Sequence, residues 1–277
     1  MRKNLLQYPA DAWAIALITV TFTGQLSLYL FVDDVRFLAA GAVGLLPFCT
    51  SVTAYNHNHI HVRTFTHRPL NRLLELLIFF ETGSSPESGT LNHIVGHHES
   101  YDRPERDTLN WRRPDGSTMG RYEFAWKTAL RHYPSCIVLG KDQPRLRRQF
   151  MVYLALGLGV LGLLIAHRPV PALIAFVMPM SVMLYVLKWA AYAHHSGLAS
   201  EDDYAGSRTH TGRFYNWATW NAGYHAAHHF KQALHWTLLP EYHQRELAAK
   251  IPAALQGDGW GEDLKQRKVH SGHPALT

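Results

Sequence analysis

Histidines gather in three groups along the chain, and their spacing suggests a metal site. The 277 residues include 19 histidines. The three groups contain eight candidate ligands in all: His57 and His61; His93, His97 and His98; His225, His228 and His229. Imidazole binds iron, copper, nickel and zinc alike, but eight histidines exceed the needs of one tetrahedral zinc ion. The groups therefore predict two metal ions held close together, each with several nitrogen ligands and room for oxygen.

Helical spacing explains how each group could converge. His57 and His61 are four residues apart, so on a helix they share one face, whereas His59 between them points away. The second group has the spacing i, i+4, i+5 and the third i, i+3, i+4. Each of these two groups is predicted to present two or three imidazoles from one helical face.

Four apolar runs must position these groups. They cover residues 11–32, 37–55, 150–166 and 170–192, and about 20 apolar residues suffice to cross a bilayer as a helix. A signal peptide is an alternative for the first run, but that run is long, lacks a clear cleavage site and is followed at once by the second. Short links at 33–36 and 167–169 predict two hairpins. The expected fold is all-α, as a single membrane-bound domain over residues 1–277, with Pro179 kinking the fourth span.

Polar blocks at residues 56–149 and 193–277 are predicted to form a helical cap that carries the histidines. Within the first block, residues 73–80 are apolar but too short to span and include Glu75, which favours a buried or interfacial helix. Residues 121–133 place aromatic and apolar side chains at helical spacing among basic ones. That pattern suits a helix on the headgroup layer or an ordinary helix packed on its own domain.

The charges predict which side the cap faces. The chain has 27 Lys and Arg residues and a net charge of +6, and only Arg36 and Arg168 fall in the two short turns. This asymmetry places both termini and the histidine groups on the cytoplasmic side, and the basic charge does not require nucleic acid. Two cysteines, Cys49 and Cys136, provide neither a disulfide framework nor a thiolate cluster.

The three groups together, H-x3-H, H-x3-HH and H-x2-HH, resemble the histidine boxes of the integral-membrane fatty acid desaturase and hydroxylase superfamily. The run from His67 to Glu75 (HRPLNRLLE) resembles the segment between its first two boxes, and Trp236 with Leu239-Pro240 resembles the tail of its third. The resemblance covers about residues 54–241. It implies a non-haem diiron centre with O2 as co-substrate, and desaturation of a fatty acyl or similar chain. Hydroxylation or ketolation of an alkyl, lipid or carotenoid substrate is the alternative.

A ninth ligand is implied by the segment after the last span. Residues 191–198 (AYAHHSGL) resemble the N-Y-x-E-H-Y-G-L stretch of membrane alkane hydroxylases, which implies His195 as a ligand, with His194 as its competitor. Gly96-His97-His98 also resembles those enzymes, although Asn92 stands where they have Glu and four spans are predicted where they have six. The implied ligands are the following: His57, His61, His93, His97, His98, His195, His225, His228 and His229. No catalytic side chain beyond the metal ligands is expected.

The partners follow from what the sequence contains. A cysteine cluster, a Gly-rich dinucleotide motif and a haem-binding extension are not found, and His270 to His273 differ from the H-P-G-G of a fused cytochrome b5. Electrons are therefore expected from a separate ferredoxin, rubredoxin or cytochrome b5 with its reductase.

A metal transporter and a zinc hydrolase are the alternative functions. A transporter would carry its histidines within the spans, whereas the three boxes lie outside them. A zinc hydrolase needs about three ligands per metal, and two separate HH pairs argue against it. Metal-bound imidazoles usually donate their other N–H to an oxygen partner, and the following residues are well placed in the sequence to accept it: Asn56, Asn92, Glu99, Asp102, Asp107, Glu201, Asp202 and Asp203.

Overall fold

The computed structural model describes residues 4–101, 103, 105–198 and 202–259. Within these residues the chain is mainly helical, which confirms the predicted all-α class, and it divides into two compact units. Unit 1 comprises Met1–Tyr192 and unit 2 comprises Ala193–Thr277. The tail from His270 to His273, Asp102 and Glu201 lie outside the described residues.

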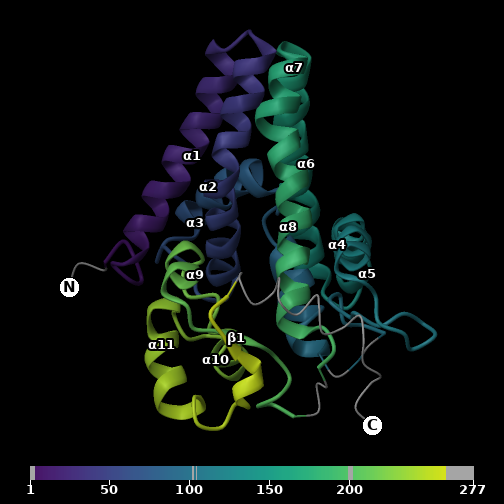
Figure 1. The fold of residues 1–277 in the computed structure, drawn as a ribbon. Coiled ribbons are helices and arrows are strands. Elements are labelled where there is room, and N and C mark those ends of the chain that lie inside the picture. The colour runs from purple at the N-terminus through teal and green to yellow at the C-terminus, as the bar shows by residue number, and fades with distance from the viewer. Residues whose placement is uncertain (1–3, 102, 104, 199–201, 260–277) are drawn as a thin grey trace. The chain divides into compact units, whose positions relative to one another are not determined.

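Unit 1 contains the four predicted spans (Figure 1). Their bounds are α1 Asp11–Phe31, α2 Val35–His61, α6 Pro144–His167, and Pro169–His195, which comprises α7 Pro169–Ala172, a π-helical turn at Leu173–Val177 and α8 Met178–His195. Each is long and apolar enough to cross a membrane. Their outer faces carry large apolar side chains such as Phe31 and Leu163, which are 78% and 72% exposed. Apolar faces of this kind fit contact with lipid and would promote aggregation in water.

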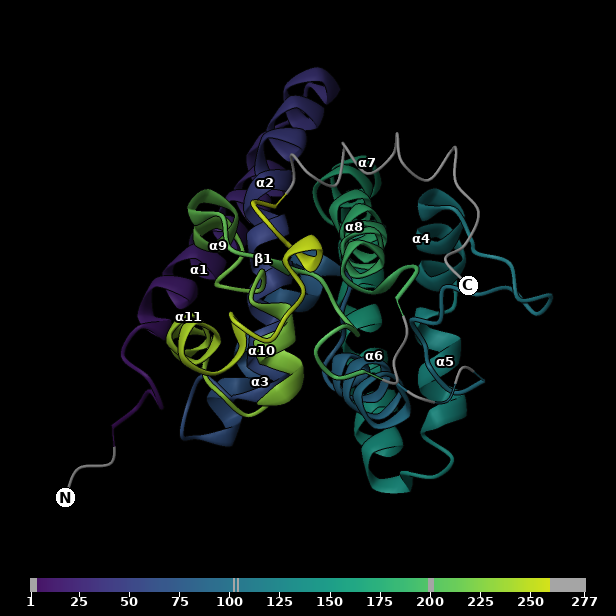
Figure 2. The ribbon, with the colours of Figure 1, turned by 60° about the horizontal axis from the view of Figure 1, so that its bottom comes forward.

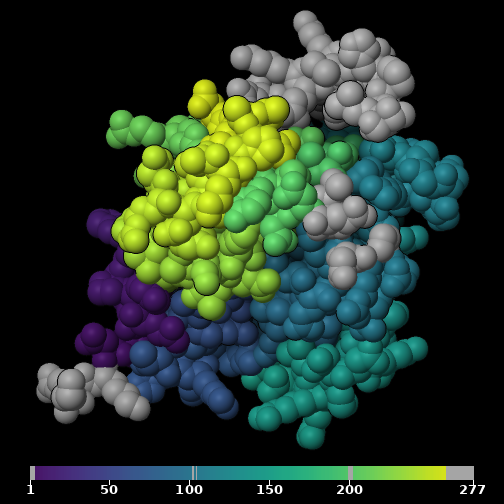
Figure 3. All heavy atoms as spheres, turned by 90° about the horizontal axis from the view of Figure 1, so that it is seen from below, coloured from purple at the N-terminus to yellow at the C-terminus, as the bar shows by residue number. Residues whose placement is uncertain are grey.

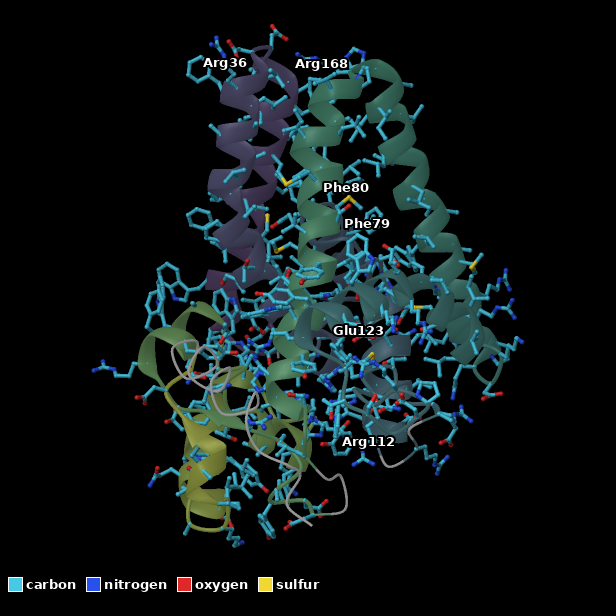
Figure 4. The ribbon with its side chains drawn as sticks, turned by 45° about the vertical axis from the view of Figure 1, so that its right-hand side comes forward. Arg36, Phe79, Phe80, Arg112, Glu123 and Arg168 are labelled. Atoms are coloured by element: carbon cyan, nitrogen blue, oxygen red, sulfur yellow. The ribbon has the colours of Figure 1, made fainter. Side chains whose placement is uncertain are left out.

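The two short turns lie at the same end of unit 1. The Arg168 guanidinium donates to the carbonyl oxygen of Tyr29 and forms an ion pair with Asp33. The Tyr29 hydroxyl donates to the carbonyl oxygen of Leu164 at 3.1 Å. Figure 4 shows Arg36 and Arg168 at this end and Arg112 and Glu123 toward the other. The ends of α1 and α6 are thus joined by hydrogen bonds.

The predicted short helix is confirmed as α3, Arg68–Thr82, which is not among the candidate spans. Its apolar positions bury Ile78 and Phe79 fully. The neighbouring Phe80 packs on Phe176 with ring centroids 5.8 Å apart, and Figure 4 shows Phe79 and Phe80 directed among the helices. The helix ends at Gly83 in the left-handed region, at φ 70°, where a Cβ would lie 2.7 Å from a backbone oxygen of α8.

Pro179 disturbs the fourth span one turn before its own position. Because proline has no N–H, it cannot bond the carbonyl oxygen four residues earlier, which belongs to Ala175. The π-helical turn at Leu173–Val177 lies at this place. The fully buried Gln25 of α1 donates its Nε2–H to the Ala175 oxygen at 3.0 Å. A polar side chain from another helix therefore satisfies the acceptor that the proline leaves open.

Residues 121–133 form two helices instead of one. α4 is Arg121–Leu130 and α5 is His132–Leu139, with the break at Arg131. Tyr122, Trp126 and Leu130 make an exposed row on α4, each about 60% exposed. Such a row fits a helix that lies on the headgroup layer. The position of α4 on the membrane remains a prediction. Figure 2 shows α5 alongside α6, which it contacts.

Unit 2 is built from short helices around a small core. Its elements are β1 Thr209–His210, α9 Arg213–Ala218, α10 His225–Phe230, a 3₁₀ turn at Trp236–Leu238, α11 Leu239–Tyr242, a π-helical turn at His243–Leu247, a 3₁₀ turn at Ala253–Leu255 and β2 Gln256–Gly257. The parallel pair β1–β2 was not predicted. The buried core of this unit includes Ala227, Leu239 and Leu247. Figure 3 shows the green-to-yellow atoms of this unit as one contiguous block.

Glu81 is a fully buried carboxyl group near the end of α3. Neither of its carboxylate oxygens has a hydrogen-bond partner among the described residues. Burial raises the pKa of Glu81 from 4.5 to about 9, because a charged carboxylate is poorly solvated in apolar surroundings. The side chain is therefore a neutral acid near pH 7.

This burial predicts a pH-dependent stability. The folded state binds the Glu81 proton more tightly than the unfolded state, so the contribution is complete below about pH 4.5 and is lost as the pH rises toward 9. The slope is at most about 1.4 kcal/mol per pH unit. We expect the thermal midpoint of the solubilised protein to fall between these pH values more steeply than that of Glu81→Gln, which cannot ionise. Equal slopes for the two proteins would contradict the prediction.

Candidate metal centre

Four histidines of unit 1 converge at the end of α2. His57 and His61 lie on its last turns, His93 belongs to a π-helical turn at Thr90–Val95, and His98 begins a 3₁₀ turn at His98–Ser100. The Nε2 atom of His93 lies 2.8 Å from Nε2 of His57 and 2.9 Å from Nε2 of His98. One ligand nitrogen from each of the four lies within 4.8 Å of the others. The predicted face shared by His57 and His61 thus meets the second box.

These contacts fit ligands of a single metal ion. With bonds of about 2.0–2.1 Å, two imidazole nitrogens at right angles on one ion lie about 3 Å apart. Burial lowers the pKa of His93 well below its ordinary value, and the charge of His98 adds to the shift. A neutral imidazole carries one N–H and one lone pair, so a contact of this length fits an N–H···N hydrogen bond or two lone pairs that bind one metal ion. A donor set made only of imidazole suits iron, copper, nickel or zinc.

His97 is held in place by a carboxyl group. Its buried ring has Nδ1 2.9 Å from Oδ1 of Asp107, and the ring is stacked on His93 with centroids 5.5 Å apart. Burial raises the pKa of Asp107 to about 8, while the backbone N–H of Leu109 and the charge of Lys188 oppose the shift. A contact at Nδ1 fixes the ring and leaves Nε2 as the ligand atom. Asp107 is one of the oxygen partners sought from the sequence.

The second box does not lie on one helical face as expected. The π-helical turn ends at Val95, and His97 has φ −125° and ψ −67°, outside the helical region. Gly96 packs closely: a Cβ there would lie 2.6 Å from Thr108 and 2.7 Å from Leu139. The helix breaks where the backbone must approach these side chains. Asn92, another residue sought as an oxygen partner, donates to the carbonyl oxygens of Ser88 and His132.

His59 points away from the candidate ligands, as predicted. Its Nε2 lies 3.2 Å from Glu75 Oε1 and its Nδ1 lies 2.8 Å from the Thr64 hydroxyl. Glu75 also forms ion pairs with Arg63 and Arg72. Burial by itself would raise the pKa of Glu75, but the hydrogen bond to His59 and the two guanidinium charges bring it below its usual value. This network is structural and stabilises the join between α2 and α3.

Unit 2 contains a second convergence of histidines. His195 ends α8, and His225 and His229 share one face of α10. Nε2 of His225 lies 2.8 Å from Nε2 of His195 and 3.2 Å from Nε2 of His229. Burial lowers the pKa of His225 well below its ordinary value. The spacing and the neutral rings fit one metal ion, as in unit 1.

The neighbouring pair His194 and His195 have different surroundings. His194 has Nε2 3.5 Å from the Tyr215 hydroxyl and Nδ1 3.2 Å from the carbonyl oxygen of Arg208, and its ring stacks on His225 with centroids 4.1 Å apart. His195 has Nδ1 3.4 Å from the carbonyl oxygen of Gly206. Nε2 of His195 lies 2.8 Å from Nε2 of His225, whereas Nε2 of His194 faces the Tyr215 hydroxyl.

His228 lies near the other histidines of unit 2. The buried ring of His228 lies 5.8 Å, centroid to centroid, from the rings of His225 and His229. The oxygen partners at Nδ1 of His194 and His195 are backbone carbonyls, and these were not predicted. Because every residue has a backbone carbonyl, the sequence does not mark which ones will accept from a histidine. The bend of the chain after His195 brings these carbonyls to the rings.

Comparison with known proteins identifies the family. The sequence model described as fatty acid desaturase matches residues 35–258, which include all nine candidate ligands. A comparison with curated proteins gave no match, and neither did one with solved structures. The family match covers most of the chain and agrees with its four candidate spans and its histidine clusters. The chain belongs to the fatty acid desaturase family.

Proposed function

We propose that the protein is a membrane-bound non-haem diiron oxidoreductase that desaturates a fatty acyl or similar lipid chain with O2. The observation that carries this proposal is the convergence of imidazole nitrogens, 2.8–3.2 Å apart, within each unit. Both groups of candidate ligands consist of histidine alone. The family match supports the choice of desaturation.

Nine histidines would hold the two iron ions. Unit 1 would supply His57, His61, His93, His97 and His98, and unit 2 would supply His195, His225, His228 and His229. Bound iron would supply the activation of O2 and the removal of hydrogen from an unactivated C–H bond. The chain itself orients His97 through Asp107 and His195 through the carbonyl of Gly206. It buries the following rings away from water: His97, His195, His225 and His228. An additional acid or base is not needed for this role.

Hydroxylation or ketolation of an alkyl, lipid or carotenoid substrate is the second candidate. Gly96-His97-His98 and the segment around His195 favour it, since both resemble membrane alkane hydroxylases. The same ligands would serve either reaction. The products differ: an alkene retains no oxygen, whereas an alcohol or ketone does.

The substrate, the electron donor and the orientation follow from the membrane setting. A hydrophobic chain would enter from the bilayer, and a separate ferredoxin, rubredoxin or cytochrome b5 with its reductase would supply electrons. Both termini and the active site would face the cytoplasm, because nearly all Lys and Arg lie away from the turns that hold Arg36 and Arg168. An acidic donor would suit this basic side, so turnover with such a donor should weaken as salt rises.

Metal analysis together with product analysis tests the proposal. The purified protein should contain two irons per chain, and a host without such enzymes should gain an unsaturated lipid when it expresses the gene. Mass spectrometry distinguishes an alkene from an alcohol or ketone, which would favour the second candidate. One zinc per chain, or unchanged host lipids together with an iron-free protein, would contradict the proposal.

A further inference from the structure

A basic groove lies between α3 and α6 of unit 1. It has a volume of about 900 Å³, and its lining includes Arg63, Arg68, Arg72, Arg145, Gln149 and Tyr153. The two helices contact each other along this groove. In Figure 3, the blue surface that contains α3 and the teal surface of α6 lie next to each other at one edge of the molecule. The groove is separate from the histidines, since it contains none of the candidate ligands.

The groove has an excess of positive charge. Arg63 and Arg72 are balanced by two buried carboxylates, Glu75 and Glu87, with which they form ion pairs. Arg68 and Arg145 are exposed and form no ion pair with another described residue. Two guanidinium groups thus remain for an anion. Guanidinium groups bind phosphate oxygens through paired N–H donors.

Two helix N-termini add to the positive potential of the groove. α3 has 15 residues and begins at Arg68, and α6 has 24 residues and begins at Pro144. The N-cap residues His67 and Gln143 make no side-chain capping hydrogen bond. Pro69 and Pro144 have no N–H, but the other backbone N–H groups of the two first turns have no capping side chain, and the helix dipoles favour an anion there.

The groove also has an apolar wall that continues into a membrane span. Leu73, which is 57% exposed, and Leu76 line it beside Tyr153, the ring of which lies 4.9 Å from the Arg72 guanidinium. Arg145 is in the first turn of a candidate span, and Tyr153 is two turns farther along it. An anion bound by the arginines would lie at headgroup depth, with room for an acyl chain along the leucines. A soluble phosphate would leave this wall uncovered.

We propose that the groove binds the phosphate of a phospholipid headgroup, and that the substrate is an acyl chain carried by such a lipid. The second half of this inference rests on the proposed function. The first half does not, because binding of a lipid phosphate requires neither iron nor O2.

Thermal unfolding of the purified full chain with short-chain lipids tests the binding. Dioctanoyl phosphatidylglycerol is the probe, dioctanoylglycerol supplies the same chains without phosphate, and inorganic phosphate represents the soluble source. A ligand that binds only the folded state raises the midpoint with concentration. We expect the phospholipid alone to do so at low concentration. The R68Q/R145Q double variant should bind it about tenfold more weakly or worse, and Arg131→Gln, which removes an exposed arginine outside the groove, should bind as wild type.

Two results would overturn the inference: equal affinity of the double variant and the wild type, or inorganic phosphate binding as tightly as the phospholipid. Iron content measured on the same samples separates this inference from the proposed function. A wild-type protein that binds the phospholipid but holds no iron supports the groove and contradicts the oxidase. A double variant that keeps its iron but turns over phospholipid-bound chains more slowly supports both proposals.

Discussion

We expect the His93→Ala variant to lose iron and to form no detectable product. His93 is the central ring of the unit 1 cluster, because its Nε2 lies within 2.9 Å of the Nε2 atoms of both His57 and His98. Removal of this ring takes away one candidate metal ligand. It also leaves His57 and His98 without the ring that lies between them. Loss of an outer-shell partner alone typically costs 10–100-fold, so loss of this ligand should lower turnover by at least about 100-fold.

Iron content by mass spectrometry and product formation in the expression host measure this effect. His67→Ala is the matched control, since His67 is exposed and its side chain makes no capping hydrogen bond with α3. The control should keep both iron and product. A folded His93→Ala protein with wild-type iron and turnover would show that the unit 1 cluster is not the metal site.

A second comparison uses His59, which belongs to the same box but not to the cluster. His59→Gln should lower the thermal midpoint, because it disrupts the buried network with Glu75 and Thr64. The fraction that folds should retain its iron. Position within a histidine box and participation in metal binding are therefore separable.

The spans and the first box could be predicted from the sequence because they depend on local rules. Apolar length identifies a membrane helix, and the i, i+4 spacing of His57 and His61 places both on one face of α2. The helix continues to His61 beyond the apolar run, as the box required. Long-range contacts were not needed for either prediction.

The second box departs from its expected geometry for a reason that lies far along the chain. Gly96 packs against Thr108 and Leu139 so closely that a Cβ on the observed backbone would lie 2.6 and 2.7 Å from them. The helix ends, and His97 turns to Asp107 while His98 turns to His93. Spacing alone cannot show this, because the distant contacts decide where the helix stops.

The proline in the fourth span illustrates the same limit. Pro179 predicts a disturbance, and the π-helical turn at Leu173–Val177 is found at the expected place. The sequence could not show that Gln25 of α1 would donate to the buried carbonyl oxygen of Ala175 that the proline leaves open. A polar residue within an apolar run is a weak signal until its partner is known.

The strongest contrast in unit 2 is expected between two adjacent histidines. His195→Ala should lose iron and product, since Nε2 of His195 lies 2.8 Å from Nε2 of His225. His194→Phe should keep both, because the ring that stacks on His225 at 4.1 Å is retained. The phenylalanine gives up contacts with Tyr215 and the Arg208 carbonyl, so this variant should be less stable by about 1–3 kcal/mol.

Iron content, product formation and the thermal midpoint must be measured together on both variants. A ligand position changes the first two, whereas a supporting position changes the third. His194→Phe that folds but loses iron as completely as His195→Ala would make His194 a ligand and would contradict the role inferred from its contacts. The distinction depends on which nitrogen faces which neighbour: His194 has an oxygen partner at each of its ring nitrogens, whereas His195 meets an oxygen at Nδ1 and directs Nε2 at His225.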